Sequence, residues 1–374
     1  MQLKSLALSA ALTQFVTSIT ADASAYWQSF QSKIDPTNIT VPVLPQTTSI
    51  DPTTECKYFL PDPNLFAINA TEWPSIWQVA TTNGMNETEE FKNLYNSIDW
   101  SKCPSAPVRT LNSDGGIDTT QYDPSDPDCW WSATTCTTPK HAGINPDIRN
   151  CPEPETWGLT YDDGPNCSHN AFYDYLEQQK LKASMFYIGS NVLDWPYGAM
   201  RGVKDGHHIA SHTWSHPLMT TKTNQEVLAE LYYTQKAIKL ATGLTPRYWR
   251  PPYGDLDDRV RWIASQLGLT AVIWNLDTND WSAGETVTID TVEKTYQNYI
   301  EMGKNGSFAN SGNIVLTHEI NNTTMQMAID NLPAIRSAYK QVIDVATCYN
   351  ISYPYFENLQ WTHTLNATTN ATNA

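Results

Sequence analysis

The chain has 374 residues with 39 acidic and 23 basic side chains, and its formal net charge at pH 7 is −16. This length allows one large or two ordinary domains, and a hydrophobic content of 40% with 11% aromatics excludes a chain that is disordered throughout. A surface this acidic repels phosphate backbones, which argues against nucleic acid as a partner.

Residues 1–23 have the pattern of a secretory signal peptide. Lys4 gives a short basic start, residues 6–19 are mostly apolar, and Ala21 and Ala23 are small residues suited to cleavage. The apolar run is too short and too often interrupted by polar residues to span a membrane, and no later stretch approaches the length of a span. We therefore expect a secreted protein without a transmembrane segment.

Residues 24–145 are rich in Pro, Thr, Asp and Trp, show little periodicity and contain four of the seven cysteines. In an oxidising compartment, seven cysteines imply disulfides with at least one thiol left over. We expect an irregular, disulfide-tied extension of unassigned role that wraps the following domain. The pair Trp130 and Trp131 has two interpretations, a platform on which a sugar stacks or plugs in the domain surface, and the second is favoured.

From about residue 146 the pattern changes to alternating strands and helices. Thr223 and Glu226 form a capping box before an apolar face that ends near Gly243, and a second helical face ends at Gly268. Strand-like apolar runs lie at 157–161, 183–188, 248–250, 269–276 and 313–317, and the helical patterns lie between them. This alternation predicts a parallel α/β sheet, either open or closed into a barrel.

Five polar clusters lie where these strands end, the place where reacting groups gather in a β/α barrel. Each alone is compatible with a purely structural role, but their joint occurrence in order favours a catalytic site. The clusters are Asp162-Asp163-Gly164-Pro165, His212 with His216, Arg250-Pro251-Pro252-Tyr253, Asp277-Thr278-Asn279-Asp280-Trp281, and His318.

These residue types can support metal-assisted hydrolysis of an amide or ester. His212, His216 and one carboxylate make a three-ligand site for Zn²⁺ or a similar ion, with a position open for water. Such an ion lowers the pKa of its water towards 7 and polarises a carbonyl. A neighbouring carboxylate could take the proton of the water, another His could protonate the leaving group, and a backbone N–H after Pro252 could hold the oxyanion.

The five clusters resemble the five ordered motifs of polysaccharide deacetylases, carbohydrate esterase family four, and are most similar to those of fungal cell-wall chitin deacetylases. The likeness covers about residues 146–350. It implies an α/β fold, a distorted (β/α) barrel of the polysaccharide deacetylase type, preceded here by the irregular extension. It also implies removal of acetyl groups from the N-acetylglucosamine units of chitin, which gives chitosan and acetate.

The resemblance assigns the proton base and the metal ligands. By position in the motifs, Asp162 is the general base and Asp163 binds the metal, Zn²⁺ or Co²⁺, together with His212 and His216. Arg250 pairs with Asp162 and positions it.

The resemblance also assigns the proton acid and the substrate contacts. His318 is the general acid, and Asp280 orients its ring, although Asp277 is a second carboxylate that could face it. The Tyr253 backbone N–H is the oxyanion contact. The remaining assignments are Trp281 and Leu316 as walls of the acetyl-methyl pocket, Trp214 as a further substrate-binding residue, and a disulfide between Cys151 and Cys348.

Ten Asn-x-Ser/Thr sequons agree with export. A glycan on Asn166 would crowd the turn at Asp163, so we expect Asn166 to be unused or its glycan to point away. The other nine are expected to carry glycans: Asn38, Asn69, Asn86, Asn305, Asn321, Asn322, Asn350, Asn366 and Asn370.

The expected organisation is a signal peptide (1–23), the extension (24–145), a catalytic domain (146–355) and a polar glycosylated tail (356–374). The tail lacks the hydrophobic end of a lipid-anchor signal, so anchoring at the plasma membrane requires a longer precursor. We expect a secreted cell-wall protein that acts on chitin or chito-oligosaccharides, and the oligomeric state stays open. Alternatives are deacetylation of xylan or peptidoglycan, or a carbohydrate-binding mannoprotein with a decayed site.

Overall fold

The computed structural model describes residues 68–363 without a gap, together with residues 30–42 and 64–66 and positions 27, 56 and 62. The predicted signal peptide and the sequons Asn366 and Asn370 lie outside these residues. Within the described part of the chain, no helix is long and apolar enough to cross a membrane.

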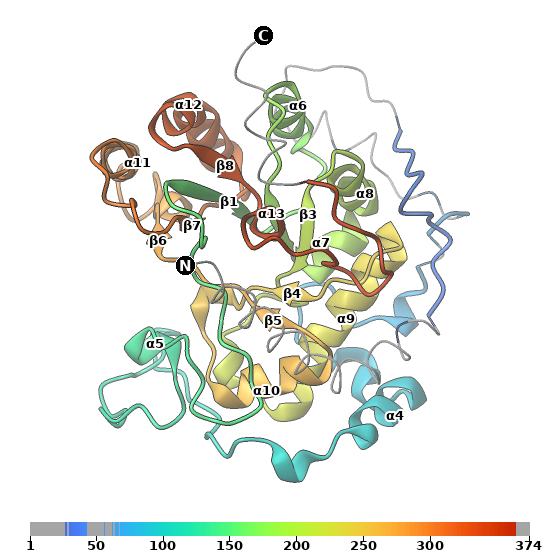
Figure 1. The fold of residues 1–374 in the computed structure, drawn as a ribbon. Helices are drawn as coiled ribbons and strands as arrows, with labels where there is room; N and C mark the ends of the chain where they lie inside the picture. The colour runs from blue at the N-terminus through green and yellow to red at the C-terminus, as the bar shows by residue number, and fades with distance from the viewer. Residues whose placement is uncertain are drawn as a thin grey trace, which may run out of the picture.

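A sheet of eight parallel strands forms the centre of the fold (Figure 1). Its strands are β1 (Thr156–Asp162), β2 (Ser184–Tyr187), β3 (His208–Ser211), β4 (Tyr248–Trp249), β5 (Thr270–Ala271), β6 (Leu276–Asp277), β7 (Asn313–Leu316) and β8 (Gln341–Ile343). The order is β5-β4-β3-β2-β1-β7-β6, with β8 paired to the first half of β1. The two edge strands, β5 and β6, follow each other in the chain, so the sheet curls as in the distorted barrel that the resemblance implied.

One predicted strand is wrong in detail. The run 269–276 is divided into β5 and β6, because the backbone between them pairs elsewhere. Val272 forms a parallel bridge with Ile148, and the Ile273 N–H donates to the Ile148 carbonyl at 2.8 Å. The short strand β8 was not predicted, and only its last residue, Ile343, is fully buried.

Two helices, α9 and α10, lie where the sequence predicts them. The Thr223–Glu226 capping box begins α9, which ends at Gly243 with a φ of 76°. The helices are α4 (Glu89–Ser97), α5 (Trp131–Thr134), α6 (Asn170–Gln178), α7 (Gly189–Asp194), α8 (Pro196–Lys204), α9 (Asn224–Thr242), α10 (Asp258–Gln266), α11 (Ile289–Lys304), α12 (Asn322–Ala338) and α13 (Val345–Cys348).

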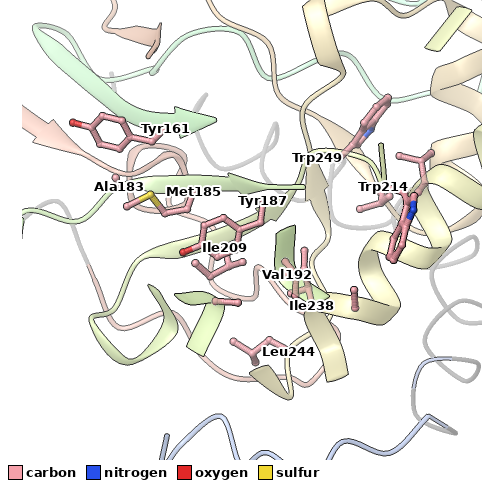
Figure 2. Close-up of a cluster of buried hydrophobic side chains, with 14 of the residues drawn as sticks. Tyr161, Ala183, Met185, Tyr187, Val192, Ile209, Trp214, Ile238, Leu244 and Trp249 are labelled. Carbon is pink, nitrogen blue, oxygen red and sulfur yellow. The ribbon is translucent and has the colours of Figure 1, made fainter. Parts of the chain in front are cut away.

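Helix α9 is buried on nearly every side. It packs against α7, α8 and α10 on one side, while α4 and the 3₁₀ helix η3 (Thr82–Glu87) cover another. Figure 2 shows part of this interior, where Trp214, Ile238 and Val192 lie among the side chains of neighbouring strands. Trp73 and Phe91 from before residue 145 belong to the same apolar cluster, so the extension shares a core with the barrel.

Three disulfides join the described cysteines. Cys151–Cys348 is the pair that the resemblance implied, and it ties the segment before β1 to α13. The other two are Cys56–Cys167 and Cys129–Cys136, and Cys103 is the free thiol. The Cys56–Cys167 bond fastens the extension to the loop before α6.

Candidate metal centre and active site

Three predicted metal ligands meet at the carboxyl ends of β1 and β3. The Asp163 Oδ1 atom lies 3.5 Å from His212 Nε2 and 3.3 Å from His216 Nε2. Asp163 has a φ of 75° and His216 a φ of 57°, both in the left-handed region that non-glycine residues seldom occupy. The turn at Asp163 points its carboxylate away from that of Asp162, so that one can bind a metal while the other accepts a proton.

The chemistry of these donors fits a divalent metal. Asp163 Oδ1 is buried and has no hydrogen-bond partner among the described residues, although a buried carboxylate oxygen is normally paired. His212 Nδ1 lies 2.7 Å from the Arg250 carbonyl, which can only accept, so the proton is on Nδ1 and the Nε2 lone pair is free to bind. Burial, and then the nearby His216, lower the pKa of His212 to about 3, which favours the neutral ring that metals bind.

A buried carboxylate on α9 holds the loop that carries the two histidines. Glu230 is fully buried and accepts hydrogen bonds from the backbone N–H groups of Trp214 and Ser215, both at 2.9 Å, and from Ser215 Oγ at 2.8 Å. It also accepts from the Ala80 N–H at 2.9 Å, so it links the extension to the histidine loop. Glu230 was not predicted from the sequence, although a glutamate within the apolar run of a buried helix is itself a signal.

Asp162 lies at the end of β1 and is held by Arg250. Arg250 is fully buried, and its Nη1 donates to Asp162 Oδ1 at 2.7 Å and to Thr160 Oγ1 at 2.9 Å. Burial raises the pKa of Asp162, and the Arg250 charge opposes that rise. The pairing predicted for these two residues is therefore present, and Asp162 Oδ2 is left 3.7 Å from His212 Nε2.

His318 follows β7 and is paired with Asp280 rather than Asp277. The Asp280 carboxylate accepts from the His318 backbone N–H at 2.8 Å and lies 2.7 Å from His318 Nδ1. Burial disfavours the charged ring, but the Asp280 charge and hydrogen bond outweigh it and raise the pKa of His318 to about 9. Asp277 instead accepts from the Asn279 N–H at 2.8 Å. His318 is thus protonated at neutral pH and can donate a proton.

These groups surround one cavity of about 410 Å³. Its lining includes both carboxylates of the first motif, the two histidines and His318, together with the predicted Tyr253, Trp281 and Leu316. Trp274 and Ile320 also line it and were not predicted, and so does Trp131, for which a platform for a sugar ring was one of two interpretations. The cavity wall is therefore largely aromatic and apolar around a polar floor.

The structure contradicts the substrate-binding role predicted for Trp214. Its side chain is fully buried, stacks on Trp73 at 6.1 Å and donates from Nε1 to the Ser75 carbonyl at 3.1 Å. The loop turns it away from the cavity, because its apolar ring packs behind the metal centre.

The described sequons differ in exposure. Asn166 is partly buried, and its Oδ1 accepts from the Ser168 N–H at 3.1 Å. Asn86 and Asn322 are also partly buried. The exposed ones are Asn38, Asn69, Asn305, Asn321 and Asn350.

Comparisons with known proteins agree with this geometry. A model of the polysaccharide deacetylase family matches residues 149–272. The chitin deacetylase of Amylomyces rouxii is 74% identical over 376 residues, which cover 100% of this chain and 89% of the relative. Chitin deacetylase 2 of Cryptococcus neoformans var. grubii is 47% identical over 315 residues, 83% of this chain and 68% of the relative.

Among solved structures, the chitin deacetylase from the fungal pathogen Colletotrichum lindemuthianum matches 59% of this chain and 99% of its own, with a TM-score of 0.53 and 24% identity. This likeness supports the fold, and the high identity to the full-length relatives supports the family. The chain belongs to the polysaccharide deacetylase family.

Proposed function

We propose that this protein is a chitin deacetylase, which hydrolyses the N-acetyl groups of N-acetylglucosamine units and leaves glucosamine units and acetate. The observation that carries the proposal is the convergence on one cavity of three residues that can bind a metal, a carboxylate paired with Arg250 and a histidine paired with Asp280. The names of the two relatives support chitin as the substrate.

In this proposal each residue has one task. A Zn²⁺ or Co²⁺ ion held by Asp163, His212 and His216 would supply Lewis acidity towards the acetyl carbonyl and the attacking water. Asp162 takes the proton of that water, and His318 gives a proton to the amide nitrogen as the C–N bond breaks.

Three further groups bind the acetyl group in this scheme. The Tyr253 backbone N–H stabilises the charge that develops on the carbonyl oxygen. Trp281 and Leu316 form the apolar wall that receives the methyl group, since both line the cavity.

We also propose the cellular setting and chain organisation that the sequence indicates. Residues 1–23 are removed on secretion, the sequons other than Asn166 carry glycans, and the product is chitosan in the cell wall. Residues 24–145, 146–355 and 356–374 form the extension, the catalytic domain and the tail.

Acetate release from N-acetylglucosamine oligomers tests the function. Release should stop on chelation and return when Zn²⁺ or Co²⁺ is added back. The variants Asp162→Asn and His318→Ala should each lower kcat by about 10²–10⁴-fold, while the exposed-site controls Asp290→Asn and His141→Ala should keep full activity. If the intact, metal-loaded protein released acetate only from acetylated xylan or peptidoglycan, or from none of these, chitin deacetylation would be excluded.

A further inference from the structure

We infer that Trp131 forms an aromatic subsite that binds a sugar ring next to the one being deacetylated, so that the extension helps to select long substrates. The inference deepens the proposed function and rests on it. Trp131 comes from residues 24–145, outside the segment 149–272 that matches the family model. Nevertheless it lines the same cavity as the metal-type ligands.

The side chain of Trp131 lies between two parts of the cavity wall. Its ring lies 5.0 Å from that of Trp274, at an interplanar angle of 60°. It also covers Gly254, which directly follows Tyr253: a Cβ atom at Gly254 would lie 2.3 Å from the Trp131 ring. Because Gly254 has no side chain and a φ of 70°, the indole ring can pack directly against its backbone at the edge of the cavity.

The backbone around Trp131 is fixed by several independent contacts. The Trp131 N–H donates to the Leu256 carbonyl at 3.0 Å. The buried neighbour Trp130 donates from Nε1 to Asp255 at 3.0 Å. Arg261 donates to the Cys129 carbonyl at 2.6 Å and to the Cys136 carbonyl at 2.8 Å, and a disulfide joins these two cysteines.

The two tryptophans therefore have different tasks. Trp130 is 1% exposed and plugs the surface of the barrel, as the sequence analysis favoured, whereas Trp131 is only partly buried and faces the cavity. An aromatic side chain that is held rigidly loses little conformational entropy on binding. Its aromatic face suits stacking against the C–H face of a pyranose ring.

The cavity also has more apolar wall than an acetyl group needs. Leu316 and Trp281 account for the proposed methyl pocket, while Trp131, Trp274 and Ile320 extend the apolar lining beyond it. Ile320 is 42% exposed and Trp281 is 47% exposed, so this lining is open to a ligand. A chain of neutral sugars fits this lining, because sugar rings on either side of the reacting unit can pack against apolar side chains.

The test compares kcat/KM for acetate release from N-acetylglucosamine dimers to hexamers. Trp131→Ala should lower the value for the hexamer by about five- to tenfold, mainly through a higher KM, and the value for the dimer by less than about twofold. Trp131→Phe should restore most of the loss. Trp77→Ala is the matched control, because Trp77 is an exposed tryptophan of the extension that does not line the cavity.

An equal loss for all chain lengths would overturn the inference in favour of a packing role for Trp131, and so would no loss at all. Calorimetric binding of the hexamer in the Asp162→Asn background gives a readout that does not need turnover. The added Trp131→Ala change should raise Kd about five- to tenfold, and an unchanged Kd would overturn the subsite. A wild type that binds the hexamer through Trp131 but releases no acetate would contradict only the proposed function.

Discussion

The charge on Asp280 decides whether His318 can act as a proton donor. The two groups are 2.7 Å apart, and burial alone would favour the neutral ring. With Asp280 present, the pKa of His318 is about 9, so the acid form persists up to that pH and is lost above it. The alkaline limit of kcat/KM should therefore lie near pH 9.

Asp280→Asn removes the charge that opposes the effect of burial, so the alkaline limit should move to lower pH. Activity at neutral pH should fall by about 10²-fold or more. The measurement is the pH profile of kcat/KM. Asp277→Asn is the matched comparison, since Asp277 lines the same cavity without a hydrogen bond to His318; a larger shift from Asp277→Asn would contradict this assignment.

The residue types of the site could be predicted, but the directions of some side chains could not. Asp162 ends β1, Asp163 follows it, and His318 follows β7; the parallel arrangement brings these strand ends together. Trp214 and Trp131 show the limit of this reasoning. Both are aromatic residues beside polar ones in sequence, and only the backbone turns decide that Trp214 packs inside while Trp131 lines the cavity.

At the scale of elements, α9 organises the metal centre through Glu230. Its carboxylate accepts bonds from two consecutive backbone N–H groups between the two histidines. Groups that orient metal ligands typically change metal affinity by about 10–100-fold when they are removed. Glu230→Ala should therefore weaken Zn²⁺ affinity by this factor, measured by competition with a chelator, and should destabilise the fold by about 2–4 kcal/mol, because it leaves buried donors unpaired.

Glu226→Ala is the control for this prediction, because it lies on the same helix and removes only the capping box. It should cost about 1 kcal/mol of stability and leave metal affinity unchanged. If Glu230→Ala destabilised the protein without changing metal affinity, Glu230 would be a structural residue only.

The same helix illustrates which elements the sequence could predict. The boundaries of α9 are set by local chemistry, a Thr-Glu capping box and a left-handed Gly243, so they can be read from neighbouring residues. The division of residues 269–276 into β5 and β6 depends instead on Ile148, a partner more than a hundred residues away. Periodicity contains no information about such a distant pairing.

At the scale of the whole molecule, the extension and the barrel share one core. Phe91 stacks on Tyr233 at 6.1 Å, and Trp73 stacks on Trp214 at 6.1 Å. Tyr233 also donates from its hydroxyl to the Met85 carbonyl at 2.8 Å. These contacts bury the face of α9 that the sheet does not cover, so the change in composition near residue 145 does not coincide with a gap in the core.

A chain that starts at residue 146 should therefore fail to fold cooperatively. Each large apolar side chain contributes about 2 kcal/mol by its burial, so losing Trp73, Met85, Phe91 and Leu94 costs about 8 kcal/mol, within the range of the total stability of a typical protein, about 5–15 kcal/mol. The truncation also exposes Trp214 and the tyrosines of α9, which favours aggregation.

Thermal unfolding and near-ultraviolet circular dichroism of residues 24–374 and 146–374 test this dependence. In the full chain, Phe91→Ala should cost about 3–5 kcal/mol, while Val108→Ala, at a side chain that is 45% exposed, should cost less than about 0.5 kcal/mol. If residues 146–374 unfolded cooperatively at the temperature of the longer chain, the extension would be an independent appendage. The packing around α9 instead makes the extension part of the folded core. This core positions Glu230, and Glu230 in turn holds the histidine loop.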